Sequence, residues 1–220
     1  MQKQVKIPIK LMFLHGLEGE MLKLKQKYLE KNFEKCVTPY MKISRWNILQ
    51  QNSFPRVLIR NKFNLQNAGY ECIQNCMNIQ INGLNESNPD ALVGISWGGG
   101  IGLLLLSQGY WQGPTVLMAP AITRFLDVVG ERDYKIQDIF DKINKQNLGR
   151  KLLIVHGDKD FTIPYTKSVE IVNKIQGSQL LTIPNGSHYL NNIHSPPIEL
   201  KQIIYDHYIK CKTQENIQNQ

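Results

Sequence analysis

The feature that most constrains the fold is an alternation of short apolar runs with longer amphipathic segments along the chain. The apolar runs have the length of strands and lie at 7–14, 36–39, 91–95, 115–118, 152–156 and 179–183. The intervening segments predict helices at 21–33, 63–82, 98–108, 134–147, 166–176 and 198–211. Strands that alternate with helices favour an α/β fold whose largely parallel sheet is covered by helices on both faces.

The domain organisation predicted from this pattern is simple. A chain of 220 residues suits one domain of ordinary size. No internal repeat and no Pro- or Gly-rich linker divides it, so we expect a single domain over residues 1–212. Residues 213–220 are rich in Gln and Asn, and we expect them to form a flexible tail.

One serine lies in a Gly-rich turn between a predicted strand and a predicted helix. The residues read Gly94-Ile95-Ser96-Trp97-Gly98, a G-x-S-x-G pattern. Such a tight turn strains the backbone at Ser96, and its flanking positions tolerate little beyond glycine. The turn lifts the hydroxyl above the sheet edge and places it at a helix N-terminus, which favours developing negative charge. The pattern therefore predicts that Ser96 is a nucleophile.

Partners for such a serine follow later strands. A serine hydroxyl is a weak nucleophile and needs an adjacent base, usually a histidine that a carboxylate orients. The strand at 152–156 runs into a loop with two carboxylates, Asp158 and Asp160. The strand at 179–183 runs into a loop that carries His188, and His194 lies slightly further along. The residues alone leave Asp158 and His194 as rivals of Asp160 and His188.

These motifs make the chain resemble the α/β-hydrolase superfamily from about residue 7 to residue 210. Members often carry H-G-x-x-D-x-x-V-P after the strand of the acid, and residues 156–164 match it with Ile163 in place of Val. The resemblance implies the α/β-hydrolase fold with little or no lid. It also implies a triad of Ser96, Asp160 and His188, which follow one another in the family's chain order.

A fourth motif, His15-Gly16-Leu17, follows the first predicted strand. The resemblance implies that this loop donates a backbone N–H to the oxyanion of the reaction, so that the two donors are Leu17 and Trp97. His15 and His156 both precede glycine at strand ends, and we expect them to be structural. His207 lies in the last predicted helix, where we expect no part in the site.

The segment between the strands at 115–118 and 152–156 bears on the substrate. Residues 121–149 number fewer than thirty, which leaves room for one or two helices but not for a large lid. We therefore expect an open cleft for a small or medium acyl group. Its apolar lining is expected to include Trp111, Met118 and Phe125, although such side chains are also typical of plain core. Residues 41–63 either overhang the site or simply connect two elements.

Composition argues against several other classes of protein. The net charge is +8, but the lysines are interleaved with acidic residues, and 23–35 reads as a solvated helix face, so we expect no nucleic-acid partner. Cys72 and Cys76 have no second ligand pair elsewhere, which argues against a zinc site, and no secretory context suggests disulfides, so we expect reduced thiols. Hydrolysis by Ser96, His188 and Asp160 needs no metal and no cofactor, and we expect neither. The apolar run at 9–14 is too short for a signal sequence or a membrane span, so we expect a cytoplasmic protein.

Together the motifs predict a serine hydrolase of small-molecule carboxylic esters or thioesters, acting through an acyl-enzyme. A peptidase or other amidase with the same triad is one alternative, because the triad does not encode the leaving group. A catalytically silent relative that binds a ligand or partner is the other, and it would be favoured if the three side chains lay out of mutual reach. The natural substrate and the oligomeric state stay open.

Overall fold

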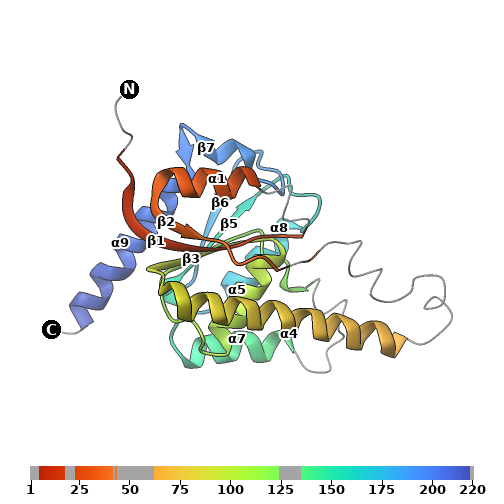
Figure 1. The fold of residues 1–220 in the computed structure, drawn as a ribbon. Coiled ribbons are helices and arrows are strands. Elements are labelled where there is room, and N and C mark those ends of the chain that lie inside the picture. The colour runs from red at the N-terminus through yellow and green to blue at the C-terminus, as the bar shows by residue number, and fades with distance from the viewer. Residues whose placement is uncertain (1–4, 18–22, 42, 44–61, 124–134, 219–220) are drawn as a thin grey trace.

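The protein is described here by a computed structural model that covers residues 5–17, 23–41, 43, 62–123 and 135–218 (Figure 1). Its centre is a six-stranded, all-parallel sheet in the order β2-β1-β3-β4-β5-β6. The strands are β1 (Ile7–Leu14), β2 (Phe33–Val37), β3 (Ala91–Ile95), β4 (Thr115–Met118), β5 (Leu152–Gly157) and β6 (Gln179–Ile183). A short antiparallel pair, β7 (His194–Ser195) and β8 (Ile198–Glu199), lies outside this sheet.

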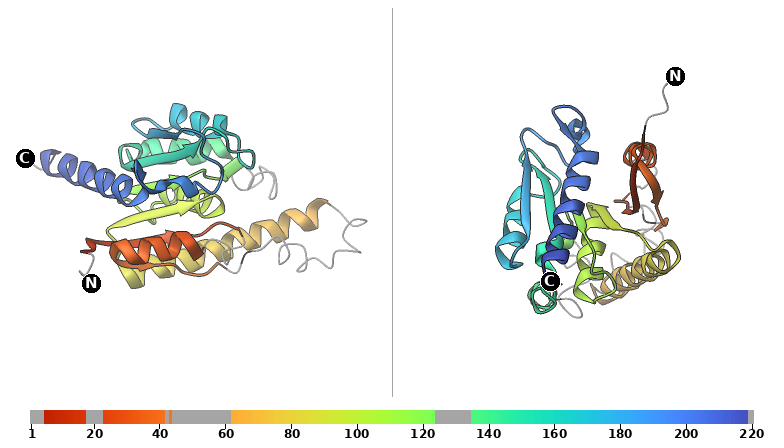
Figure 2. Two further views of the ribbon diagram at one scale, coloured as in Figure 1. Left: turned by 90° about the horizontal axis from the view of Figure 1, so that it is seen from above. Right: turned by 90° about the vertical axis from the view of Figure 1, so that its left-hand side faces the viewer.

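Helices cover both faces of the sheet, as predicted (Figure 2). One face packs against α4 (Lys62–Ser87), α5 (Trp97–Ser107), α7 (Ile136–Lys145) and α8 (Tyr165–Lys174). The other face packs against α1 (Lys23–Asn32) and α9 (Leu200–Gln218). Short 3-10 turns lie at Gly149–Lys151 and Asn191–Ile193. Among the described residues, no helix is both long enough and apolar enough to cross a membrane.

An apolar core lies on each face of the sheet, which explains why the strands are continuous apolar runs in the sequence. In β1, Met12 and Leu14 point to the α4–α5 face, while Leu11 and Phe13 point to the α1–α9 face. All four side chains are at most 1% exposed. Successive strand residues point to opposite faces, so a strand covered on both sides must be apolar at every position.

The chain order of the strands places two motifs at one point of the sheet edge. From β1 the chain moves to β2 at one side, whereas from β3 it moves to β4 at the other side. The carboxyl ends of β1 and β3 therefore flank a topological switch point, where ligands bind in open parallel sheets. His15-Gly16-Leu17 follows β1, and Ser96 follows β3.

Several element boundaries differ from those predicted, among them the start of β2 and the end of α4. The strand predicted at 36–39 begins already at Phe33, because this side chain is fully buried and pairs with Ile7 of β1. The helix predicted to end at residue 82 continues to Ser87. Gly83 lies inside this helix, and a Cβ there would lie 2.5 Å from Cγ of Pro39. The glycine therefore allows α4 to pack closely against Pro39.

The last helix also ends later than predicted. α9 continues to Gln218, into the segment where we expected a flexible tail to begin at residue 213. Glu215 lies 2.6 Å from Nζ of Lys151 and 2.9 Å from Nζ of Lys212, so one carboxylate joins this end of α9 to the start of β5. The ion pairs are a tertiary feature that Gln- and Asn-rich composition does not reveal.

We predict that Glu215→Gln lowers the free energy of unfolding by about 0.5–1 kcal/mol, as expected for a partly exposed ion-pair network. Urea unfolding at low salt and in 1 M NaCl measures the change, and high salt should remove most of it. Glu170→Gln, which removes only a more exposed pair with Lys167, is the matched control with a smaller effect. An equal loss at both salt concentrations would contradict the electrostatic explanation.

Candidate active site

Ser96 lies at the apex of a strained turn between β3 and α5. Its backbone has φ 53° and ψ −115°, a region that residues other than glycine rarely occupy. The neighbouring strand holds it there, since the Ser96 N–H donates to the carbonyl of Met118 at 2.9 Å. The Ser96 carbonyl accepts from the N–H groups of Gly100 at 3.0 Å and Ala121 at 2.9 Å. These bonds fix the hydroxyl at the carboxyl edge of the sheet.

The glycines of the motif allow close contacts that a side chain would prevent. A Cβ on Gly94 would lie 2.8 Å from the carbonyl oxygen of Gly98. A Cβ on Gly98 would lie 2.6 Å from the carbonyl oxygen of His15, so this glycine lets α5 approach the loop after β1. The sequence-based requirement for glycine on both sides of Ser96 thus has a direct steric cause.

The structure brings Ser96, His188 and Asp160 into one hydrogen-bonded row. Nε2 of His188 lies 3.0 Å from Oγ of Ser96, and Nδ1 of His188 lies 2.7 Å from Oδ2 of Asp160. A carboxylate only accepts, so Nδ1 carries the proton and Nε2 is left to accept the serine O–H. Of the rivals, Asp158 is exposed to solvent and His194 stacks on Tyr28 with ring centroids 4.7 Å apart.

The Asp160 carboxylate is buried and fully hydrogen-bonded. Oδ1 accepts from the N–H groups of Thr162 at 2.7 Å and Ile163 at 2.9 Å, and Oδ2 accepts from His188 and from Nε2 of His156 at 3.0 Å. Burial acts to raise the pKa of Asp160, but the bonds from His156, His188 and Ile163 outweigh it and hold that pKa well below its usual value. Asp160 is therefore an anion at neutral pH.

The loop of the acid and the loop of the histidine are joined through their backbones. The Lys159 N–H donates to the carbonyl of Gly186 at 3.0 Å. A Cβ on Gly186 would lie 2.8 Å from Cα of Gly157, so the two loops touch at a pair of glycines. This contact sets the separation of Asp160 and His188 independently of their own hydrogen bond.

A buried lysine of α1, Lys25, binds the backbone of the loop that carries His188. Lys25 of α1 is 1% exposed, and its Nζ donates to the carbonyl of Tyr189, next to His188. Burial lowers the pKa of Lys25 to about 8. Leu190, which follows, has φ 48° and is fully buried, so the loop is held in a strained conformation. The prediction of a solvated face over 23–35 is therefore wrong at Lys25.

His15 orders the loop after β1 through both ring nitrogens. Nδ1 lies 2.8 Å from the carbonyl oxygen of Gly16, and the N–H of Met41 donates to Nε2 at 2.9 Å. Nδ1 therefore carries the proton, and the ring is neutral. Burial lowers the pKa of His15, and the bond to Gly16 opposes this only in part. The predicted structural role of His15 agrees with these contacts.

The same contacts orient the peptide between Gly16 and Leu17. In a trans peptide the C=O and the following N–H point in opposite directions. The Gly16 carbonyl faces the His15 ring, which reaches toward the segment after β2, so the Leu17 N–H faces away from that ring. Trp97 is the first residue of α5, and its N–H belongs to the helix N-terminus beside Ser96. Both predicted oxyanion donors thus lie at the ends of β1 and β3.

The residues expected to line an acyl pocket lie elsewhere. Nε1 of Trp111 donates to Oγ1 of Thr115 at 2.9 Å, at the start of β4. In a parallel sheet this is the edge opposite to Ser96, so the expectation for Trp111 is wrong. Met118 is completely buried in the core on the α1–α9 face and presents no surface to a substrate. Phe125 lies outside the described residues, as does nearly all of 41–63.

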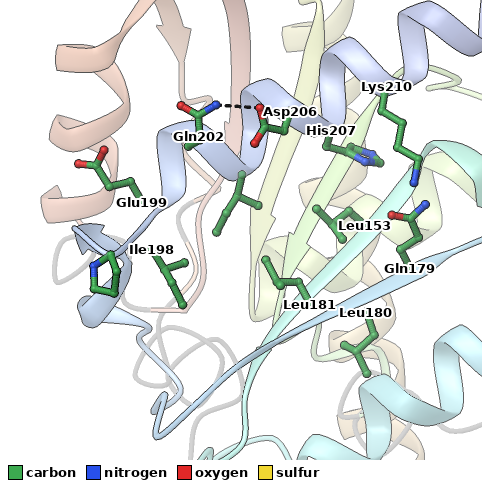
Figure 3. Close-up of a pocket in the computed structure, with 12 residues that line it drawn as sticks. Leu153, Gln179, Leu180, Leu181, Ile198, Glu199, Gln202, Asp206, His207 and Lys210 are labelled. Carbon is green, nitrogen blue, oxygen red and sulfur yellow. Dashed lines mark hydrogen bonds between the residues drawn. The ribbon is translucent and has the colours of Figure 1, made fainter.

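A groove of about 430 Å³ lies between β6 and α9 (Figure 3). Leu153, Leu181 and Ile203 form part of its apolar wall. Gln202 donates to Asp206 at 2.7 Å along its rim. Neither Ser96, Asp160 nor His188 lines it, and it lies beside the start of β6, away from the carboxyl edge. This groove is therefore separate from the candidate active site.

Two residues that contact the site, His156 and Lys25, were not assigned to it from the sequence. His156 contacts the acid itself, and the H-G-x-x-D spacing was a usable signal because it places a histidine four residues before Asp160. Lys25 had no such signal. It is one of several lysines in α1, and only the packing of that helix shows which of them is buried.

Comparisons with known proteins bear on the fold. No family model and no curated protein matches the sequence. Among solved structures, the ferulic acid complex of Est1E from Butyrivibrio proteoclasticus matches with 16% identity and a TM-score of 0.60, over 94% of this chain and 90% of that one. MGS-MChE2, an α/β hydrolase enzyme from the metagenome of sediments of the Mar Chica lagoon, matches with 16% identity and a TM-score of 0.56, over 93% and 92%.

A third similar structure is an α/β serine hydrolase homologue from Coxiella burnetii, with 15% identity, a TM-score of 0.51 and coverage of 93% of this chain and 86% of that one. At identities this low the likeness concerns the fold. The chain has the α/β-hydrolase fold, as the motifs predicted.

We predict that the free energy of unfolding falls as the pH drops from 7 to 5, in part because of His15. Burial holds the pKa of folded His15 below 6.5, so in this range the unfolded chain binds a proton that the folded chain resists. His15→Gln cannot titrate and should give a flatter curve, by at most about 1.4 kcal/mol per pH unit. Urea unfolding at pH 5, 6 and 7 measures both curves, and parallel curves would exclude this role.

Proposed function

We propose that the protein is a serine hydrolase that cleaves carboxylic esters or thioesters of small to medium acyl groups. The observation that carries the proposal is the row in which Nε2 of His188 lies 3.0 Å from Oγ of Ser96 and Nδ1 lies 2.7 Å from Asp160. A nucleophile in reach of a base that a buried carboxylate orients is the arrangement that acyl transfer requires.

In the first half-reaction, Oγ of Ser96 attacks the substrate carbonyl carbon while Nε2 of His188 takes the hydroxyl proton. The ionised Asp160 stabilises the imidazolium that forms. The carbonyl oxygen becomes an oxyanion, which the N–H groups of Leu17 and Trp97 stabilise from the loop after β1 and from the start of α5. His188 then protonates the leaving alcohol or thiol, and the acyl group stays on Ser96 as an ester.

In the second half-reaction, water enters in place of the leaving group. Nε2 of His188 takes a proton from this water, whose oxygen attacks the acyl carbon. Collapse of the second tetrahedral intermediate returns the proton to Oγ of Ser96 and releases a carboxylic acid. The same two N–H groups stabilise both oxyanions, so one geometry serves both steps.

The similar structures support the hydrolase class and the kind of product. One is a serine hydrolase homologue, and another holds ferulic acid, a carboxylic acid of moderate size. Hydrolysis of a carboxylic ester or thioester releases such an acid. A catalytically silent relative is disfavoured, because its signature would be side chains out of mutual reach, whereas here each contact is at most 3.0 Å.

We predict that a fluorophosphonate probe labels Ser96 covalently, because an adjacent base activates its hydroxyl, whereas an isolated serine hydroxyl is too weak a nucleophile at neutral pH. Ser96→Ala should fold normally, lose the label, and lower ester turnover by about 10⁴–10⁶-fold. Intact-protein mass spectrometry and peptide mapping measure the adduct. Ser87→Ala, at the far end of α4, is the control that keeps the label. A fully active Ser96→Ala variant would refute the nucleophile.

We also predict that p-nitrophenyl esters and matched thioesters are turned over faster than the corresponding anilides. Among the esters, short and medium acyl chains should react faster than long ones. Initial rates on matched series, each corrected for the reaction in buffer alone, measure both preferences. Faster cleavage of the anilides would favour a peptidase or other amidase on the same triad. If no series is turned over and the probe does not label the protein, the proposal that it is an enzyme is wrong.

A further inference from the structure

Two serine–histidine pairs meet on the same carboxylate oxygen. On one side, Ser96 contacts His188, whose Nδ1 lies 2.7 Å from Oδ2 of Asp160. On the other side, Oγ of Ser168 lies 2.6 Å from Nδ1 of His156, whose Nε2 lies 3.0 Å from the same Oδ2. The second pair comes from β5 and from the first turn of α8, and the proposed mechanism does not use it.

The partners of His156 define its proton positions. Nε2 faces the Asp160 carboxylate at 3.0 Å and the carbonyl oxygen of Ile163 at 3.1 Å, and both of these groups only accept. Nε2 therefore carries a proton. Nδ1 is then free to accept the O–H of Ser168 in the neutral ring. The ring is completely buried, so water does not compete for either nitrogen.

Ser168 does not act as a second nucleophile. Ser168 is 0% exposed, and it contacts the ring nitrogen of His156 that does not face Asp160. No substrate carbonyl reaches a hydroxyl in that position. The second pair therefore acts on Asp160, and through Asp160 on His188.

The charged surroundings of this group are few. The titratable side chains on the carboxylate are His156 of β5 and His188 of the loop after β6. Tyr165 of α8 faces the His156 ring edge-on, with centroids 5.7 Å apart, and its hydroxyl pairs with Thr182. Asp158 and Lys159, in the same loop, are exposed to solvent. Lys25 of α1 is a buried cation near His188, since its Nζ donates to the carbonyl of Tyr189. The ring of Tyr189 lies edge-on to His188, with centroids 5.7 Å apart.

We propose that His156 is a positioning residue of the triad, whose Nε2–H holds Oδ2 of Asp160 and lowers the pH at which His188 becomes a free base. The Nε2–H of His156 compensates part of the negative charge on Oδ2, so that His188 experiences a less negative oxygen. A less negative oxygen stabilises the His188 imidazolium less, so the neutral base is available at lower pH. This role rests on the proposed function, in which His188 takes the proton of Ser96.

If His156 had only a structural role, its replacement would not change the titration midpoint of His188. Loss of packing around β5 and α8 lowers stability, and it lowers the rate at every pH. Loss of the hydrogen bond to Oδ2 moves the midpoint of His188 in a defined direction. The titration of His188 is therefore the readout that separates the two roles.

The experiment compares four proteins by histidine NMR titration: the wild type, His156→Leu, His156→Gln and Ser168→Ala. His156→Leu removes the donor, and we expect the midpoint of His188 to rise by about one pH unit. His156→Gln keeps an amide N–H that reaches Oδ2, and should return the midpoint toward the wild-type value. Ser168→Ala leaves Nε2 of His156 on Asp160, and should keep the wild-type midpoint.

His156→Leu leaves the Ser168 hydroxyl buried without its partner, which costs stability. The double variant His156→Leu/Ser168→Ala removes that hydroxyl and tests the same shift if the single variant does not fold. The ¹⁵N spectrum of the wild type gives a test without any substitution, since Nε2 of His156 must carry a proton. A ring that carries its only proton on Nδ1 would overturn the assignment.

The rate of fluorophosphonate labelling against pH completes the test. Its acid limb should move with the His188 midpoint in the leucine variants. An unchanged midpoint in these variants, or an equal shift in Ser168→Ala, overturns the role of His156 even where Ser96 is labelled. Absence of labelling in the wild type refutes the proposed function, while the NMR titration still decides whether His156 acts on His188.

Discussion

The site depends on one buried carboxylate. Asp160 has no exposed side-chain surface, and an ionised carboxylate in such a place is costly unless donors satisfy it. Two backbone N–H groups and two imidazoles supply those donors. The loops after β5 and β6 must therefore come together for the charge to be tolerated, and their joining is what places His188 beside Ser96.

The serine side of the site rests on a different constraint, which is steric. Ser96 keeps its strained backbone because β4 and α5 hold its N–H and its carbonyl on both sides. Gly98 then brings the start of α5 against the loop after β1, where His15 orients the Gly16–Leu17 peptide. The nucleophile and its two proposed oxyanion donors are thus brought together at the carboxyl edge of the sheet by backbone contacts and by the His15 ring.

Three histidines with different roles lie around the site. His188 faces Ser96, His15 orders the loop after β1, and His156 contacts the far side of the acid. The role of each histidine follows from the hydrogen-bond donors and acceptors around its ring. Lys25 adds a fourth support from α1, since its amine holds the backbone beside His188. The catalytic proposal and the role proposed for His156 both follow from this one hydrogen-bonded network.

Sequence alone determined the fold class and proposed the three residues of the row. Apolar runs covered on both faces, a Gly-flanked serine and loop residues after later strands are local patterns, and local patterns are visible in a sequence. Tertiary structure decided what depends on packing between distant segments. It set Asp160 apart from the exposed Asp158, buried Lys25, and joined His156 to the acid. It also put Trp111 at the opposite edge and Met118 in the core, because which edge or face a side chain takes depends on elements far away in the chain.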